Sequence, residues 1–201
     1  MPGPASRANG LRSRKALMER GLALVAQGGR HRVSIGALAA ALGMSKSAVH
    51  AHFGSKAALE AALVDEAADR FGRAVVDPAG AAPPGLARLA ALCDAFLLFA
   101  AESGGAGLTP VHRAFGRDLA TAAESRRLAW AASWRRTLDQ AATGAETAGE
   151  LARGVEPAQV AYELDALLNG AVHAIETTPP ADVVRRTRLA VDRTLLGWSA
   201  R

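Results

Sequence analysis

The sequence predicts an all-α protein with a small N-terminal domain, residues 1–58, and a larger helical body, residues 59–201. Apolar residues recur at helical spacing, and no stretch alternates apolar and polar residues for long enough to form a strand. Serines and glycines stand where short helices would begin and end in the first sixty residues. Two long apolar segments close the chain, separated only by a proline pair.

Composition sets limits on the class of protein. The chain has 201 residues, half of them hydrophobic, which is enough for one sizeable core or for a small domain joined to a medium one. No run of about 18 apolar residues suits a membrane-spanning helix, and residues 1–10 lack the apolar stretch of a secretory signal. Cys93 is the single cysteine, so neither a disulfide framework nor a multi-cysteine zinc site is expected. We expect a cytoplasmic protein without a cofactor.

Charge divides unevenly along the chain. Residues 1–60 contain nine Lys and Arg but two acidic residues, a net charge of +7. Because the whole chain carries +5, residues 61–201 sum to −2. This division is typical of a head that binds a polyanion and a body with another role, although a solvated basic surface would give the same count.

Local signals place the helices of the N-terminal domain. Ser34, Ser45 and Ser55 stand at N-cap positions, where a hydroxyl accepts from free helix amides. Gly43 suits the left-handed position that ends a helix. The expected helices are residues 12–26, 35–42, 45–52 and 55–75.

The body continues the helical pattern after a proline- and glycine-rich turn at residues 77–85. Helices are expected at residues 86–101, from about 109, and at 122–142, 158–177 and 181–199. The helix at 86–101 is apolar nearly all round, which predicts burial on most sides. The last two helices are joined by a short connection, so we expect them to pair in an antiparallel manner.

Residues 35–54 predict a helix-turn-helix. Ala39 has the small side chain that two closely crossing helices require, and Gly43 makes the turn between them. The residues expected to face inward are Ile35, Leu38, Leu42 and Val49, with Met44 in the turn. The outer face of the second helix carries mainly short or hydrogen-bonding side chains. Such a helix can sit deep in a major groove, which is roughly 12 Å wide.

This segment resembles the signature of the TetR family of transcriptional regulators. The matching run is Leu38-Ala39-x3-Gly43-Met44-Ser45-Lys46-x2-Val49-His50-x-His52-Phe53-x-Ser55-Lys56-x2-Leu59. The resemblance covers residues 12–60, and beyond them only the helical layout and the terminal helix pair are similar. It implies a dimeric repressor that binds a near-palindromic double-stranded operator and is released by a small-molecule effector. The family usually has tyrosine where this chain has His50, so the contact made there is open.

The resemblance also implies roles for individual residues. Ser34 and Lys56 would bind phosphates, and Phe53 would belong to the core. Arg12, Arg14 and Lys15 would reach the DNA from an N-terminal arm, or would serve solubility only. The complete set of expected DNA-binding residues is Ser34, Lys46, Ser47, Ala48, His50, His52 and Lys56.

The body supplies candidates for a ligand pocket and for a homodimer interface. Asn169 and His173 are four residues apart, so they share a helix face that could line a pocket or hold a buried hydrogen bond. The expected ligand-binding residues are Cys93, Phe96, His112, Phe115, Trp130, Trp134, Asn169 and His173, and Tyr162 is a further candidate. The expected interface residues are Leu164, Leu168, Val191 and Leu195, each of which could instead belong to the core of one chain.

Other functions stay open at this point. His50 and His52 are two residues apart on one helix and no third ligand lies nearby, so no metal site is expected. An enzyme could use His112 or His173 as a base, but no catalytic triad and no glycine loop after a strand accompany them. An activator that needs no ligand, or an architectural DNA-binding protein, would share the basic head.

Overall fold

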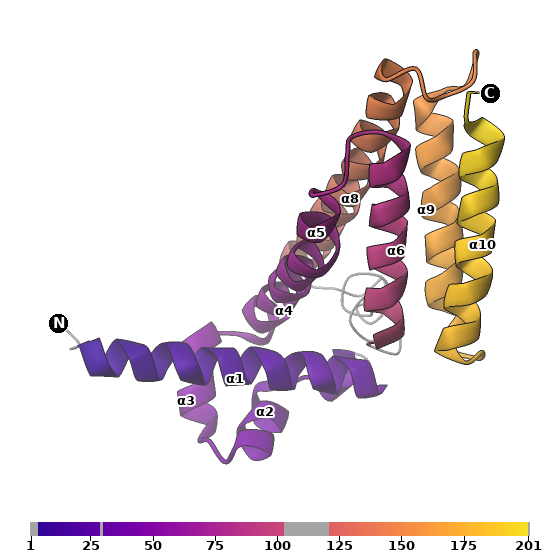
Figure 1. Ribbon diagram of the computed structural model, residues 1–201. Helices are drawn as coiled ribbons and strands as arrows, with labels where there is room; N and C mark the ends of the chain where they lie inside the picture. The colour runs from indigo at the N-terminus through magenta and orange to yellow at the C-terminus, as the bar shows by residue number, and fades with distance from the viewer. Residues whose placement is uncertain (1–3, 29, 103–120, 201) are drawn as a thin grey trace. The chain divides into compact units, whose positions relative to one another are not determined.

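The computed structural model describes residues 4–28, 30–102 and 121–200, and they are almost entirely helical (Figure 1). The predicted all-α fold is confirmed: within these residues, the β-pairing is limited to an isolated bridge between Leu151 and Ser199. The helices are α1 (Pro4–Gly28), α2 (Ile35–Leu42), α3 (Lys46–Phe53), α4 (Lys56–Phe71), α5 (Asp77–Ala79), α6 (Leu86–Glu102), α8 (Thr121–Thr147), α9 (Pro157–Ala174) and α10 (Pro180–Trp198). A 3-10 turn covers Arg30–Arg32, and a π-helical turn covers Gly72–Val76.

The described residues form two compact units. The first contains residues 4–68 with 121–128, and the second contains residues 69–102 with 129–200. Each unit therefore uses two separate stretches of the chain, and α4 and α8 contribute residues to both. The domain boundary expected after residue 58 stays a prediction.

The first unit is built from α1, α2, α3 and most of α4. Leu17, Leu38, Val49 and Leu63 are fully buried in its core. α1 and α4 approach closely at Gly21, where a methyl group would lie 2.7 Å from Cδ2 of Leu63. α1 starts at Pro4, about two turns before the expected start at residue 12. Its first residues are helical although they lack the apolar spacing from which the start was predicted.

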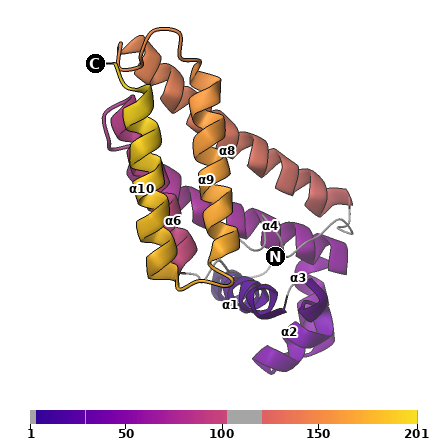
Figure 2. The same cartoon turned by 90° about the vertical axis from the view of Figure 1, so that its right-hand side faces the viewer.

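The second unit places α6, α9 and α10 side by side, as the two views in Figures 1 and 2 agree. α6 is buried on most of its surface, as predicted, but Leu98 keeps 49% of its surface exposed. The turn expected at residue 77 begins later, because residues 72–79 stay helical. Pro78 is compatible with this because it lies in the first turn of α5, where no amide donor is required.

The end of α8 and the C-terminus are tied together. The backbone amides of Ala152 and Ala200 donate to the carbonyls of Trp198 and Glu150, at 2.8 and 2.7 Å. The Glu150 carboxylate also accepts from the Leu86 amide at 2.7 Å and so caps the start of α6. Among the described residues, no helix is long and apolar enough to cross a membrane.

Gly85 generates the first prediction. Its φ is +102°, and a Cβ there would collide with the Glu150 carboxylate that caps α6. Gly85→Ala should therefore lower the free energy of unfolding by about 2–3 kcal/mol, through backbone strain and the lost cap. Gly154→Ala is the matched control, because Gly154 has a φ of +83° with open space around it, and should cost about 1–2 kcal/mol. Urea unfolding of both variants measures the difference, and equal losses would contradict the role given to Glu150.

Candidate nucleic-acid interface and ligand-binding core

Two capped helix starts frame the helix-turn-helix. The Ser34 hydroxyl accepts from the Ala37 amide at 3.0 Å, and the Ser45 hydroxyl accepts from the Ala48 amide at 3.1 Å. Ser55 does the same for Ala58 at the start of α4, at 3.1 Å. The left-handed glycine expected after α2 is present, since Gly43 has a φ of +62°. The local signals therefore set the starts of α2, α3 and α4 and the end of α2 where the sequence predicts them, whereas α4 ends at Phe71 and a π-helical turn covers Gly72–Val76.

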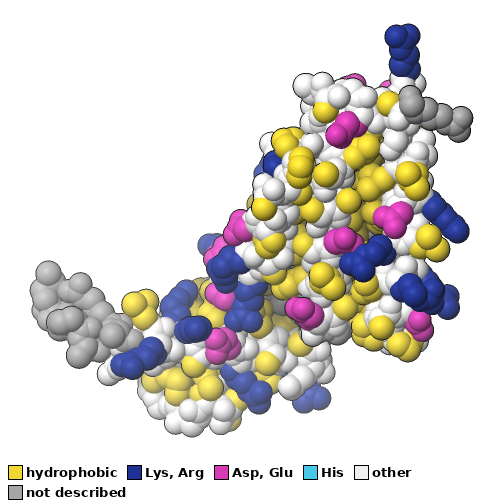
Figure 3. Space-filling model, viewed as in Figure 1, with side chains coloured by type: hydrophobic (Ala, Val, Ile, Leu, Met, Phe, Trp, Pro, Cys, Tyr) yellow, Lys and Arg dark blue, Asp and Glu magenta, His cyan; other side chains and the backbone are white. Residues whose placement is uncertain are grey.

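The expected DNA-binding residues all belong to the first unit, and none of them is fully buried. The side chains of Lys46, Ser47, His50 and Lys56 are exposed, and those of Ser34, Ala48 and His52 are half-buried. Lys46 lies across the start of α2, because a methyl group at Gly36 would be 3.5 Å from its Cε. Ser34 and Lys46 are therefore neighbours although twelve positions separate them. Figure 3 shows several Lys and Arg side chains on the visible face of this unit.

Lys56 stands beside a buried acid. Its Nζ lies 3.7 Å from Oε1 of Glu60, one turn along α4, and the Glu60 side chain is only 4% exposed. That oxygen accepts no hydrogen bond from the described residues, and the ammonium group of Lys56 lies close enough to balance its charge. A lysine held in this way projects from the start of α4 while half of its side chain stays exposed.

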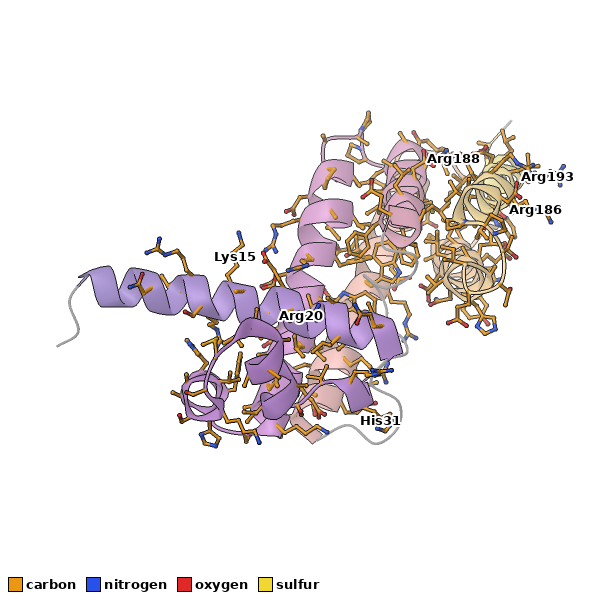
Figure 4. All side chains as sticks on the ribbon, turned by 90° about the horizontal axis from the view of Figure 1, so that it is seen from below. Lys15, Arg20, His31, Arg186, Arg188 and Arg193 are labelled. Atoms are coloured by element: carbon orange, nitrogen blue, oxygen red, sulfur yellow. The ribbon has the colours of Figure 1, made fainter. Side chains whose placement is uncertain are left out.

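The three basic residues expected in an N-terminal arm differ in their contacts. Arg12 donates to the Asn9 side chain at 2.6 Å, and Lys15 lies 4.0 Å from Glu19, both within α1. Figure 4 shows Lys15 extending away from α1. Arg14 instead donates to the backbone carbonyl of His52 at 3.1 Å, a contact with the last turn of α3.

The second unit contains an aromatic cluster: Phe71, Phe96, Phe99, Trp130 and Trp134. Phe71 lies at its centre and contacts the other four rings edge-on, with centroid distances from 5.1 to 5.9 Å. Phe96 and Trp134 stack at 5.5 Å. The Trp134 indole donates to Oδ1 of Asp165 at 3.0 Å, which joins the cluster to α9.

The expected ligand-binding residues divide into three groups. Phe96, Trp130 and Trp134 meet in the aromatic cluster, and Cys93 is buried near them on α6. His112 and Phe115 lie outside the described residues. Asn169 donates to the Asp165 carbonyl on its own helix at 2.8 Å, while His173 and Tyr162 are exposed on α9.

Cys93 is a core residue and not an exposed thiol. Its side chain is 1% exposed, and burial, with a smaller contribution from Asp94, raises the pKa of its thiol to about 12. The reactive thiolate is therefore absent near neutral pH. Phe71 and Asp165 were not among the expected residues. Phe71 is the last residue of α4, whose fully buried leucines belong to the first unit, and the sequence does not distinguish Asp165 from Glu163, two positions before it.

Among the described residues of the second unit, a cleft and an open groove are present, and neither is lined by the expected ligand-binding residues. A cleft of about 250 Å³ lies between α6 and α8 and includes Arg88, Leu92, Thr137 and Gln140. The Arg88 guanidinium is already held there by the carbonyls of Gly80 and Ala82. An open groove of about 540 Å³ runs between α6 and α10.

The residues expected at the dimer interface are buried within a single chain. Leu164 and Leu168 are 0% exposed, Val191 is 3% and Leu195 is 8% exposed. This burial agrees with the stated alternative that they belong to the core of one chain, and their part in an interface stays a prediction. Large apolar side chains on the outer faces of these helices are instead Tyr162, Leu189 and Leu196.

Comparison with known proteins agrees with this arrangement. The family model for bacterial regulatory proteins of the tetR family matches residues 17–63, and that for the tetracyclin repressor-like C-terminal domain matches residues 85–191. No curated protein sequence matches the chain.

Solved structures share the fold at low sequence identity. A TetR transcriptional regulator from Chloroflexus aurantiacus J-10-FL has a TM-score of 0.84 at 20% identity, over 96% of this chain and 98% of that one. AibR, in complex with isovaleryl coenzyme A and operator DNA, has a TM-score of 0.71 at 18% identity, over 88% and 96%. A SmeT–triclosan complex has a TM-score of 0.76 at 20% identity, over 94% and 92%. With two family models covering most of its length, the chain belongs to the TetR family of bacterial transcriptional regulators.

Proposed function

We propose that the protein is a dimeric repressor, which binds a near-palindromic operator through α3 and is released by a small molecule bound in its second unit. The observation that carries this proposal is the exposed face of α3, placed between the capped starts of α2 and α4. Free amides and the helix dipole favour phosphate at such starts, and the short side chains of α3 suit a major groove.

Six of the seven expected DNA-binding residues have a role in this proposal, and His52 is considered below for its backbone carbonyl. Ser34 and Lys56 hold phosphates on the two sides of α3, and these contacts fix the position of the helix. Lys46, Ser47 and Ala48 are on the first turn of α3 and approach the base edges. His50 is exposed one turn later and can donate to a phosphate where relatives have tyrosine.

The dimer is proposed on the outer faces of α9 and α10. Tyr162 is 68% exposed, Leu196 74% and Leu189 49%, and exposed apolar side chains on neighbouring helices are typical of an interface. A twofold arrangement would present two copies of α3 to two half-sites, roughly 34 Å apart along the DNA.

The ligand is proposed to act at the aromatic cluster and Asp165. By their names, two similar structures hold a small molecule, isovaleryl coenzyme A or triclosan. Burial raises the pKa of the Asp165 carboxyl in this chain, although hydrogen bonds from Trp134 and Asn169 and the charge of Arg135 oppose the shift. A carboxyl group whose charged form is disfavoured by burial, as that of Asp165 is, is typical of a functional site. A ligand that binds one state of the protein more tightly than the other would then shift operator affinity.

DNA binding gives the first test of the proposal. The full-length protein should bind its own upstream DNA, and Lys46→Ala and Lys56→Ala should weaken binding because each removes a cation at the interface. The slope of log affinity against log salt should fall by about 1 for a lost phosphate contact. Arg153→Ala, an exposed charge in the loop after α8, is the control of equal charge and should bind like the unaltered protein. Failure to bind either upstream DNA or a genomic fragment library at low salt would reject the function.

The interface gives a second test. Leu196→Glu should convert the dimer into a monomer, because it places a charge at the most exposed apolar position of α10. Light scattering after size exclusion measures the mass. Leu128→Glu, at a leucine of α8 that is 53% exposed, is the matched control and should leave the dimer intact. If Leu196→Glu stays dimeric, the interface lies at other residues and this part of the proposal is wrong.

Asp165 gives a third test through the pH dependence of stability. Its raised pKa in the folded state means that the unfolded chain loses its proton first as pH rises above the ordinary value of 3.8. Stability should therefore fall as pH rises through this window and stay reduced at neutral pH. Asp165→Asn keeps an oxygen for the Trp134 indole, so it should melt at a higher temperature than the unaltered protein at pH 7. A lower melting temperature would show that the attraction of Arg135 outweighs burial.

A further inference from the structure

Arg14 joins the middle of α1 to the end of α3 by two contacts. One guanidinium nitrogen donates to the His52 carbonyl at 3.1 Å, and the guanidinium carbon lies 5.0 Å from the centre of the Phe53 ring. The two residues contacted are the last two of α3, and 38 positions separate Arg14 from His52. Phe53 itself is 8% exposed and is part of the core of the first unit.

The backbone carbonyls in the last turn of α3 need hydrogen-bond donors from outside the helix. The last four carbonyls of any helix lack amides of their own helix to accept from. Gly54, with a φ of +73°, turns the chain and donates to the His50 carbonyl at 2.7 Å, so it satisfies one of them. Arg14 satisfies the His52 carbonyl and places a positive charge at the negative end of the helix dipole.

The geometry points to Arg14 as a positioning residue for DNA recognition: it fixes the C-terminal turn of α3 against α1 and does not itself bind DNA. This inference rests on the proposed role of α3 as the recognition helix. α3 has only eight residues, so its order depends on its contacts more than on its own propensity. A loose last turn would let the DNA-facing first turn sample more orientations, and binding would then have to order the helix.

A phosphate contact by Arg14 is the competing role, and salt dependence separates the two. Each phosphate contact adds about 0.9 to the slope of log affinity against log salt. A positioning residue changes affinity but leaves that slope alone. Arg153 is the control of equal charge, because it is an exposed arginine in the loop after α8 and is not among the residues proposed to meet the DNA.

The experiment uses full-length protein, its own upstream DNA and four chains: unaltered, Arg14→Ala, Arg14→Lys and Arg153→Ala. Affinity is measured over a salt series, and amide hydrogen exchange of residues 46–54 is measured without DNA. Arg14→Ala should weaken binding by about 4- to 30-fold, the range set by losing one helix-terminal cation and one exposed cation–π contact. Its salt slope should stay unchanged, and the amides of the last turn of α3 should exchange faster. Arg14→Lys keeps a donor and a charge and should recover part of the affinity.

Two outcomes would overturn the inference. Arg14→Ala with unaltered affinity and exchange would show that α3 is positioned without Arg14. A slope reduced by about 1 with unaltered exchange would make Arg14 a phosphate ligand. Lys46→Ala, measured in parallel, separates these results from failure of the proposed function: if it binds DNA like the unaltered protein, the role of α3 fails and not that of Arg14 alone. Melting curves identify any variant that does not fold, and Arg14→Lys then carries the test.

Discussion

Phe71 is the side chain on which the core of the second unit depends. Its ring meets rings from α6 and α8 edge-on, and it is only 2% exposed. Edge-on aromatic contacts have a preferred geometry, so the ring orients both helices in addition to filling space. The same helix places Leu59 and Leu63, both fully buried, in the core of the first unit. α4 is therefore a structural part of both units, and neither core is complete without it.

The parts of the fold that could be predicted are those with local causes. Ser34, Ser45 and Gly43 act on their nearest neighbours in the chain, so the ends of α2 and α3 follow from the sequence. The aromatic cluster needs the tertiary arrangement, because Phe71 and Trp134 are far apart in the chain. The residues expected at the dimer interface show a second reason why sequence-based prediction is incomplete. α9 and α10 are apolar on two sides, and periodicity cannot tell which side faces the core, as Leu164 demonstrates.

The net charge of residues 1–60 could be interpreted only with the structure. A net charge of +7 predicts a surface that attracts a polyanion, but it does not say which cations are available. Arg14 is engaged with α3, and Lys56 is paired with a buried glutamate. Lys46 remains at the exposed surface beside Ser34, with its stem against α2. In the proposed function, Arg14 holds α3 in place, Lys56 both balances Glu60 and binds a phosphate, and Lys46 meets the DNA directly.

The proposed regulation requires a physical link between ligand and DNA, and α4 offers one. Lys56 begins this helix and Phe71 ends it, so one helix of 16 residues carries both a proposed phosphate contact and the ring at the centre of the aromatic cluster. A helix transmits displacement along its length because its backbone hydrogen bonds resist stretching, whereas a loop would absorb it. Any ligand that alters the packing around Phe71 or the Trp134–Asp165 bond acts directly on the end of α4. A packed aromatic core has few discrete arrangements, which is the condition for a switch between two states.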